Sequence, residues 1–521
     1  MKILRYKFIW TISVLIVFGA KQELFAQTLP VGLLENVEDS VRRDQLLGKD
    51  SLGSSYMIRP LHNVGPSRYV YSAENKHFAF SLLPLVLQNQ INSHYAYGRN
   101  DNSMIPAKGY EAMISGGFYA RAGPLSIQLR PEYIYAQNKD FDLPETVDNY
   151  LYYAYPELVY NRIDNPSKFN GGAYKKGNWG QSSVRLNFDP VSVGISSESL
   201  WWGPGKKNSL LMSNNAPGFK HLTLNTMRPV DVFIGKIEAQ IIAGRLEASN
   251  VSLPENPNPE GSPTAFKTKP DTWRSIAGII VTYQPKWLPG LSVGFDRTAV
   301  AYHNKRDSAV KFFSWFGRWV MPETHAEVYV QYGRNDHLAN SAGKKLHSNA
   351  YVAGFNKLVS LNRQQEYIQV GVEFTQLEVQ KKGQITNHSW YLDDLIVHGY
   401  TNTGQVMGAG IGPGGNMQSL DVSWVKGLKR IGISMDRIVN NNDFFWATVY
   451  PVKDIRRHWI DLVYSGTASW NFNRIILNAQ LSYIKSLNYQ WGYIDSKGFF
   501  FDLPKYDKNN IHTKLGIMYN F

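Results

Sequence analysis

Apolar and polar residues alternate with a period of two along most of this chain. In residues 511–521 the odd positions carry Ile, Thr, Leu, Ile, Tyr and Phe, while the even positions carry His, Lys, Gly, Met and Asn. The same alternation runs through residues 368–375 and 474–483. Successive side chains of a strand point to opposite faces. The pattern therefore predicts many strands, each with one apolar and one polar face.

Short turns between these segments give an independent check of the register. The residues that flank a two-residue hairpin loop oppose each other and share a face. Phe188 is thus expected to pair with Val191, and Trp424 with Ile431. Both partners in each pair belong to the apolar set of their strand. Three turns agree in this way: Gly123-Pro124, Asp189-Pro190 and Gly427-Leu428.

Alternation of this kind fits a soluble β-sandwich or a transmembrane β-barrel, which point their apolar faces inward and outward respectively. Short turns alternate with long polar segments, and the chain ends on Phe521 within an alternating segment, as bacterial outer-membrane barrels do. Several tryptophans lie near expected strand ends, as in interfacial girdles: Trp287, Trp315, Trp319, Trp390, Trp446, Trp459 and Trp470. We predict an all-β fold: an antiparallel transmembrane barrel over residues 71–521, with roughly 16 to 18 strands.

The first 70 residues follow another pattern. In residues 1–26 three basic residues precede an apolar run, and a small residue stands at the expected cleavage point, which is typical of a secretory signal peptide. Apolar residues from Leu33 to Leu47 share one helical face, and Gly48 ends the run. Residues 27–70 are therefore predicted to form a small helical segment on the periplasmic side of an exported outer-membrane protein.

Composition narrows the partners and cofactors. The 521 residues include no cysteine, which excludes disulfides and thiolate metal sites. The formal charge is +13, and the mean hydropathy of −0.32 is too low for a bundle of transmembrane helices. A positive charge is compatible with anionic partners, but no nucleic-acid-binding motif is present. We expect no metal, no cofactor and no nucleic-acid partner.

Turn length orients the barrel. Short turns face the periplasm in such barrels and long loops face outward. Residues 139–181, 200–218 and 404–418 are accordingly predicted at the extracellular end. Two of these segments contain Gly-Pro-Gly, and their length and composition suit loops that fold into the lumen.

Residues 200–218 read LWWGPGKKNSLLMSNNAPG and resemble the signature of the capsule assembly Wzi family. Residues 329–336 (YVQYGRND) and 399–414 (GYTNTGQVMGAGIGPG) support the resemblance. It implies an outer-membrane barrel of about eighteen strands with a small periplasmic helical element and no known catalysis. The implied role is lectin-like: the protein attaches or organises capsular or other surface polysaccharide. Outer-membrane lipid and the barrel assembly machinery are the further implied partners, and the charge of the glycan stays open.

The chemistry of residues 200–218 suits a sugar ligand, because aromatic rings stack on C–H faces and amides bond to hydroxyls. The candidate polysaccharide-binding residues in this stretch are Trp201, Trp202, Lys206, Lys207, Asn208, Asn214 and Asn215. The two lysines would serve an anionic glycan. The alternative is that Trp201 and Trp202 only anchor the loop within the barrel.

The GRND segment has two interpretations as well. Glu327, Tyr329 and Gln331 alternate with apolar residues and are expected to face the lumen, with Arg334 and Asp336 at the outer end. These side chains bind sugar in one interpretation. In the other they form an ion-pair network that braces the interior, which the sequence favours.

Two other function classes remain in competition. A diffusion porin shares every barrel feature and differs in having an open lumen. An outer-membrane hydrolase needs a nucleophile or activated water near a histidine and a carboxylate. His221, His325 and His388 are the histidines considered, and none lies in a recognisable catalytic pattern. We expect a non-enzymatic protein.

Overall fold

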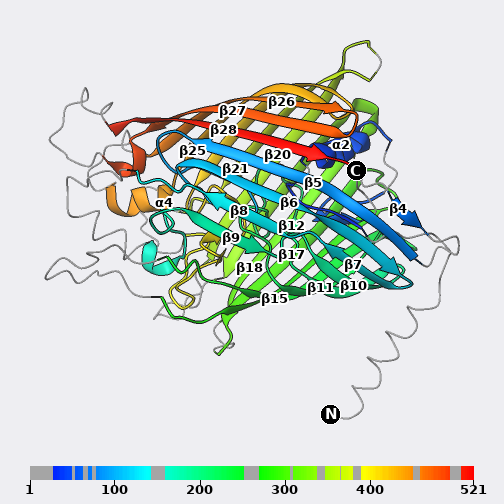
Figure 1. Cartoon of the computed structure of the whole chain (residues 1–521), viewed down its shortest axis with the longest axis horizontal. Helices are drawn as coiled ribbons and strands as arrows, with labels where there is room; N and C mark the ends of the chain where they lie inside the picture. Colours follow the sequence, from blue (N-terminus) through cyan, green and yellow to red (C-terminus); the bar gives the residue numbers. More distant parts are fainter. Residues whose placement is uncertain are drawn as a thin grey trace.

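In the computed structural model the chain forms a closed antiparallel β-barrel of 18 strands, three of which are interrupted (Figure 1). The description covers residues 27–33, 35–49, 53–62, 69–72, 78–141, 159–251, 269–304, 309–336, 347–363, 365–379, 389–449, 458–492 and 506–521. The signal peptide expected at residues 1–26 lies outside the described residues. Within them, no helix is long and apolar enough to cross a membrane.

The wall is one continuous sheet in which neighbours along the chain are neighbours in space. Each of the three interrupted strands consists of two labelled segments in line: β7 with β8, β9 with β10, and β13 with β14. The strands are β5 (Phe78–Asn92), β6 (Gly109–Ala122), β7 (Leu125–Leu129), β8 (Glu132–Ala136), β9 (Tyr174–Asn178), β10 (Ser183–Phe188), β11 (Val191–Ser196), β13 (His221–Thr226), β14 (Val230–Val232), β15 (Gly235–Leu246), β16 (Arg274–Pro285), β17 (Leu291–Tyr302), β18 (Val310–Met321), β19 (Ala326–Asp336), β20 (His347–Ser360), β21 (Tyr367–Gln376), β24 (Asn416–Lys426), β25 (Lys429–Val439), β26 (Ile460–Phe472), β27 (Ile475–Leu487) and β28 (Lys508–Tyr519).

Shorter elements complete the description. Strand β4 (Tyr69–Ser72) pairs with the start of β5. The remaining elements are β1 (Thr28–Leu29), α2 (Glu35–Leu46), β2 (Ile58–Arg59), β3 (Leu61–His62), η2 (Tyr160–Arg162), β12 (Trp201–Trp202), η3 (Pro322–Thr324), β22 (Thr401–Asn402), β23 (Gln405–Val406), α4 (Asn442–Phe444), η4 (Phe445–Val449) and η7 (Tyr489–Trp491).

The predicted registers are confirmed. Phe188 pairs with Val191 across the β10–β11 turn, and Trp424 pairs with Ile431 across the β24–β25 turn. The barrel closes where β28 pairs with β5, from Tyr519 opposite Leu85 to His512 opposite Asn92. The break between β7 and β8 falls at Pro131, which has no N–H to donate to a ladder.

The two faces of the wall carry opposite chemistry, as the alternation predicted. Large apolar side chains point outward, and Ile433, Ile195 and Leu481 are 69%, 60% and 59% exposed. The lumen side carries buried Ser, Thr, Asn, Gln and charged residues. Trp287, Trp315 and Trp319 are exposed on the outer surface. The same expectation for Trp390 is wrong, because that ring is fully buried inside the barrel.

Helix α2 and the C-terminus lie at one end of the barrel, and α4 lies at the other (Figure 1). The end with α2 carries the short turns, which makes it the periplasmic end. Val37 and Val41 of α2 pack against a buried apolar cluster that includes Tyr56, Leu61 and residues of the barrel wall, so the amphipathic helix predicted at 33–47 is present at 35–46. The segment that follows enters the lumen, where the backbone N–H of Ser55 donates to Glu238 Oε2 at 2.7 Å.

Two expectations about loops and the terminus need correction. Residues 139–181 are not wholly a loop, because β9 pairs with β8 and extends the wall. In residues 404–418 the part before β24 folds into the lumen and is buried, as the composition of this loop suggested. The last strand ends at Tyr519, and Phe521 follows two residues later with its ring against that of Tyr519 at 5.3 Å.

Loss of Phe521 is expected to impair assembly of the barrel. The Phe521 ring is exposed beside Tyr519, where folding factors can reach it, and β28 closes the barrel by pairing with β5. We expect the deletion variant to accumulate far less heat-modifiable, folded protein in outer-membrane fractions than the wild type. Normal amounts of folded barrel would contradict this role.

Candidate functional site

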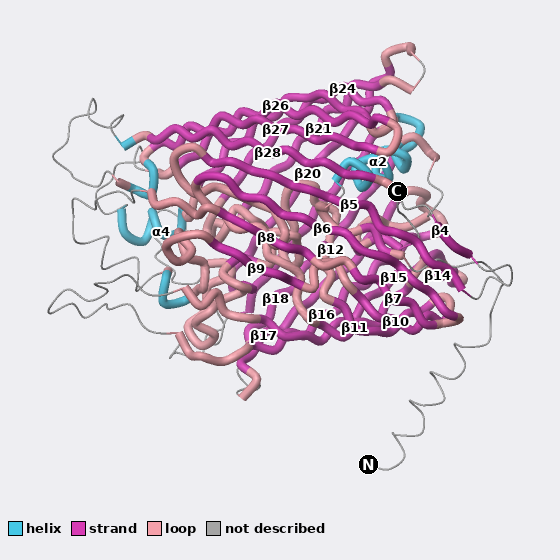
Figure 2. Tube along the Cα trace, in the orientation of Figure 1, coloured by secondary structure: helices cyan, strands magenta, loops and turns pink. Residues whose placement is uncertain are grey.

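The stretch singled out in the sequence enters the barrel. After β11 the chain turns inward, and β12 pairs with β2, placing Trp201 opposite Arg59. Figure 2 shows β12 and neighbouring loop segments within the outline of the wall. The turn that follows depends on glycine: Gly203 has φ +111, and a Cβ on Gly205 would lie 1.8 Å from the Asn208 carbonyl oxygen. A larger residue at either position would displace the loop.

Both tryptophans of this stretch are used for internal contacts. Trp202 is fully buried, and its Nε1 donates to Gln240 Oε1 at 2.9 Å. Trp201 is 3% exposed and lies beneath the Arg59 guanidinium, whose carbon is 4.5 Å from the ring centroid. Neither ring offers a free face for stacking on a sugar. The anchoring alternative therefore describes their geometry, and the stacking platform does not.

One carboxylate holds the turn after Trp202. Glu373 on β21 accepts the backbone N–H groups of Lys206, Lys207 and Asn208 at 2.7, 3.1 and 2.8 Å. It also accepts the Tyr329 hydroxyl at 2.8 Å. Consecutive N–H groups in a turn form an anion-binding concavity. In this barrel that concavity is filled by a carboxylate of the wall, which locks the loop across the lumen.

The asparagines proposed for glycan binding bond to other parts of the chain. Asn208 Nδ2 donates to Thr375 Oγ1 at 3.1 Å. Asn214 Nδ2 donates to the Asn100 carbonyl at 2.7 Å, and Asn215 Nδ2 donates to the Val406 carbonyl at 2.9 Å. These amides tie residues 200–218 to two other loops and to the wall.

The second Gly-Pro-Gly loop packs on the first. The Tyr391 hydroxyl donates to the Leu210 carbonyl at 2.8 Å, and the Ser213 N–H donates to the Met407 carbonyl at 2.8 Å. Trp390 stacks on Phe312 of β18 with ring centroids 5.3 Å apart. Together with residues 53–62 these loops form a plug, and its apolar side chains belong to the largest buried cluster. The segments responsible are far apart in sequence.

The inward side chains of β19 brace the plug, as the ion-pair interpretation predicted. Glu327 accepts Arg42 Nε of α2 at 2.7 Å and Arg318 Nη2 of β18 at 2.6 Å. Tyr329 contacts Glu373, as described above. Arg334 does not join this network, because it is exposed on the outer face of the strand. The Asp336 side chain lies outside what the structure describes.

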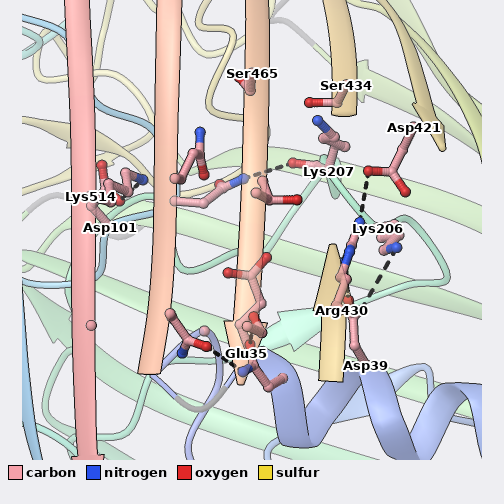
Figure 3. A pocket seen from close by; sticks show the side chains of 18 of the residues that line it. Glu35, Asp39, Asp101, Lys206, Lys207, Asp421, Arg430, Ser434, Ser465 and Lys514 are labelled. Carbon is pink, nitrogen blue, oxygen red and sulfur yellow. Dashed lines mark hydrogen bonds and ion pairs between the residues drawn. The ribbon is translucent and has the colours of Figure 1, made fainter. Parts of the chain in front are cut away.

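A polar cavity of ≈ 250 Å³ remains between the plug and the wall formed by β24–β28 and β5 (Figure 3). Helix α2 bounds it on the periplasmic side, and residues 97–102 line another part. Small inward residues of the wall create the space, among them the paired Ser434 and Ser465, and Gly516 on β28. The lining also carries amides that can donate and accept: Asn36, Gln88, Asn89, Gln90, Asn100, Asn102, Asn356, Asn478 and Gln480.

The cations of this cavity are matched by carboxylates. Arg430 lies 2.7 Å from both Asp39 and Asp421, and Lys206 Nζ is 3.8 Å from Asp39. Lys207 Nζ lies 3.1 Å from Asp436. Figure 3 shows these contacts as dashed lines above α2.

The plug and helix groups of this network have shifted pKa values. Burial lowers the pKa of Lys206, although Asp39 opposes the shift. Burial also disfavours charged Lys207, but the Asp436 carboxylate outweighs it and raises the lysine pKa. For Asp39, burial is outweighed by Lys206 and Arg430, so its pKa falls well below its usual range. The two lysines proposed as anion ligands therefore already have acidic partners.

The carboxylates Asp421 and Asp436 of the barrel wall were not identified as site residues from the sequence. Their signal was present, since each occupies an inward position of an alternating strand. Asp421 pairs with Arg430 of the neighbouring strand, but the plug partner of Asp436 is Lys207, 229 residues away in the chain, so that pairing could not be inferred. The histidines considered for catalysis form no visible catalytic group: His221 Nδ1 is 2.7 Å from the Phe219 carbonyl, and His325 ends the turn η3. His388 lies outside the described residues, which contain no cluster suited to a metal ion.

Comparison with known proteins shows that the chain is similar to one family in sequence and in fold. Residues 98–302 match the family model described as capsule assembly protein Wzi. No curated protein sequence matches the chain. Among solved structures, Wzi of Escherichia coli is similar over 95% of this chain and 100% of its own, with a TM-score of 0.59 and 13% identity. It is described as an outer-membrane protein involved in group 1 capsule assembly and as a carbohydrate-binding β-barrel.

Other solved barrels are less similar. Acinetobacter baumannii OccAB1 covers 87% of this chain and 98% of its own, with a TM-score of 0.43 and 9% identity. Pseudomonas aeruginosa OprD covers 84% and 94%, with a TM-score of 0.41 and 8% identity. The family match spans residues 200–218, the stretch on which the resemblance was first based. By sequence over residues 98–302 and by fold over nearly its whole length, the chain matches the Wzi capsule assembly proteins.

Proposed function

We propose that this protein is an outer-membrane, lectin-like barrel that attaches or organises capsular or other surface polysaccharide. The family match over residues 98–302 supports this role, and Escherichia coli Wzi is itself described as a carbohydrate-binding barrel. The observation that carries the proposal is the plug. Residues 200–218 lie within the matched region and cross the lumen, where Glu373 holds three of their N–H groups.

The plug argues against the porin alternative. A diffusion porin keeps a water-filled channel, whereas the lumen here contains two interlocked loops and residues 53–62 with buried apolar side chains. The space that remains is a polar cavity of ≈ 250 Å³ beside the plug. Such a lumen suits a protein that holds a ligand at the membrane surface more than one that conducts solutes.

The cavity supplies the site we propose for a segment of the glycan. Sugar hydroxyls both donate and accept, and the amides and serines of the lining match this requirement. Lys206 and Lys207 lie in the cavity and are retained as candidate ligands. Because both have carboxylate partners, we propose recognition through hydroxyl groups rather than through an anionic group of the polymer.

The remaining candidates take supporting roles in this proposal. Trp201, Trp202, Asn208, Asn214 and Asn215 position the plug that forms one side of the cavity. The role proposed is binding and not catalysis. Outer-membrane lipid and the barrel assembly machinery are proposed as the other partners, the latter through the C-terminal strand.

Filling the cavity should release polymer from the cell surface. Ser465→Phe places a ring in the cavity, so we expect a drop of about tenfold in oligosaccharide affinity, equivalent to about 1.4 kcal/mol. A polymer that engages many barrels amplifies this loss through avidity. The measurement compares polysaccharide on washed cells with polysaccharide shed to the medium, in wild-type, deletion and variant strains.

Gly466→Phe is the matched control. It changes the next residue of β26, which points away from the lumen, and a side chain there meets nothing within 4 Å. The control should retain polymer like the wild type. If deletion of the whole protein leaves retention unchanged, the proposed function is wrong. If only deletion releases polymer and folded Ser465→Phe does not, the cavity is not the glycan site.

Releasing the plug should open the barrel to ions. Wild-type protein is expected to give negligible steady conductance in planar bilayers, because the interlocked loops cross the lumen. Glu373→Ala removes four hydrogen bonds to a charged acceptor, at a cost of roughly 3 kcal/mol or more. We expect frequent open-channel steps from this variant.

Glu366→Gln serves as the control for conductance. Glu366 lies at the periplasmic β20–β21 turn and forms an ion pair at 3.1 Å with Lys426, whose side chain is 47% exposed. Exposed pairs contribute little to stability, so this variant should stay closed. Large currents from the wild type would favour the porin, and a closed Glu373→Ala barrel would show that other contacts suffice to hold the plug.

A further inference from the structure

The outer surface of the barrel carries a hollow that faces the membrane. It has a volume of ≈ 630 Å³ and lies over β13, β15, β16 and β17, near their extracellular ends. Four alanines and a serine line its floor: Ala243, Ala277, Ala299, Ala301 and Ser275. The hollow is separate from the lumen, because these side chains belong to the outward set of their strands.

The strand register explains why the surface is hollow here. Ala243 pairs with Ala277, and Ala277 pairs with Ala299, so three methyl groups lie side by side on the neighbouring strands β15, β16 and β17. In the next row toward the extracellular rim, Ser275 pairs with Ala301. Further toward the periplasm, outward positions of the same strands carry larger apolar side chains, among them Leu224, Ile241 and Val293. A lipid chain can approach the backbone more closely at this point than around it.

Basic side chains stand at both edges of the hollow. Lys220 and Arg245 are neighbours at the β13–β15 edge, where the Arg245 N–H bonds to the Lys220 carbonyl. Lys311 ends the alanine row on β18, opposite Ala299, and Arg297 lies in the row below. Lys220, Arg297 and Lys311 are all exposed. Arg245 pairs with Glu247 at 2.7 Å and also lies over the Trp273 ring.

Two of these cations need an anion from outside the protein. Lys311 lies opposite Asp336 of β19 in the strand register, whereas Lys220 and Arg297 form no ion pair in the part of the chain that the structure describes. Unpaired cations on the lipid face destabilise a barrel, most at mid-membrane and less near the interface. Anionic headgroups attract such side chains. A headgroup at the extracellular rim would therefore offset the cost.

The spacing of the cations indicates the kind of headgroup. Lys220, next to the start of β13, and Arg297 on β17 are separated by three strand spacings, which is about 14 Å across the sheet. A single phosphate cannot reach both edges, whereas a headgroup with two phosphates can. The alanine floor between the edges offers contact for acyl chains.

We propose that this hollow binds a bisphosphorylated, multiply acylated glycolipid of the outer leaflet. One phosphate lies at Lys220, the other lies at Arg297, and the acyl chains cover Ala243, Ala277 and Ala299. The site is independent of the polysaccharide-binding role, since it lies on the opposite face of the wall from the plug and the cavity. It fixes the depth of the barrel in the outer leaflet.

Native mass spectrometry of the purified, full-length protein in detergent tests this site, with bisphosphorylated lipid A as the probe. We expect wild-type protein to hold one lipid A at least tenfold more tightly than monophosphorylated lipid A or phosphatidylglycerol. Ala277→Phe should fill the hollow, and Arg297→Gln should remove one phosphate contact. Each variant should lower lipid A affinity about tenfold.

The matched controls change equivalent positions on another wall. Ala468 of β26 and Arg437 of β25 are exposed on the outer face, so Ala468→Phe and Arg437→Gln should leave lipid A binding unchanged. Heat modifiability confirms folding of every variant. Equal binding of phosphatidylglycerol, equal losses in the controls, or full lipid A binding by folded Ala277→Phe would each overturn the proposal.

Discussion

A membrane offers no water to satisfy backbone hydrogen bonds, and this constraint governs the whole architecture. The strands can span only if every ladder is paired, which the contact between β28 and β5 achieves by closing the sheet. Closure then sorts the side chains, since one face of each strand meets lipid and the other meets the lumen. The inward set is polar, so whatever fills the barrel must satisfy many donors and acceptors.

The plug meets that requirement by hydrogen bonding and ion pairing rather than by shape alone. Glu373 and Glu327 show the principle, because each is a buried carboxylate whose oxygens are shared between plug or helix groups and wall groups. Removing one partner of such a buried pair leaves an uncompensated charge, which makes the arrangement specific. Apolar contacts between Trp390, Phe312 and neighbouring rings then exclude water from the part of the plug that packs on β18.

The protein thus presents two different surfaces to its surroundings. On the lumen side, matched charges and amides leave a cavity without a strong excess of positive potential. On the membrane side, several basic residues near the extracellular rim have no acidic partner among the described residues. The net charge of +13 is therefore a poor guide to the glycan. Part of it faces lipid, and the lysines of residues 200–218 are neutralised internally.

The sequence alone determined the features that depend on neighbouring residues. Alternation set which side chains face lipid, and the short turns set register, so the pairs of Phe188 with Val191 and Trp424 with Ile431 were predictable. These quantities follow from the period of a strand and the geometry of a two-residue turn. The resemblance carried by residues 200–218 located the family for the same reason, because it is a local pattern.

Only the tertiary structure decided where the loops go and what their side chains contact. Trp201 and Trp202 carry the composition of a sugar platform, yet the lumen places Arg59 and Gln240 against them. Trp390 has the composition of an interfacial anchor and is buried in the plug. Such outcomes depend on partners dozens to hundreds of residues away, brought together only when the barrel closes. No local periodicity records that proximity, which is why the faces of the strands were predictable and the contacts of the plug were not.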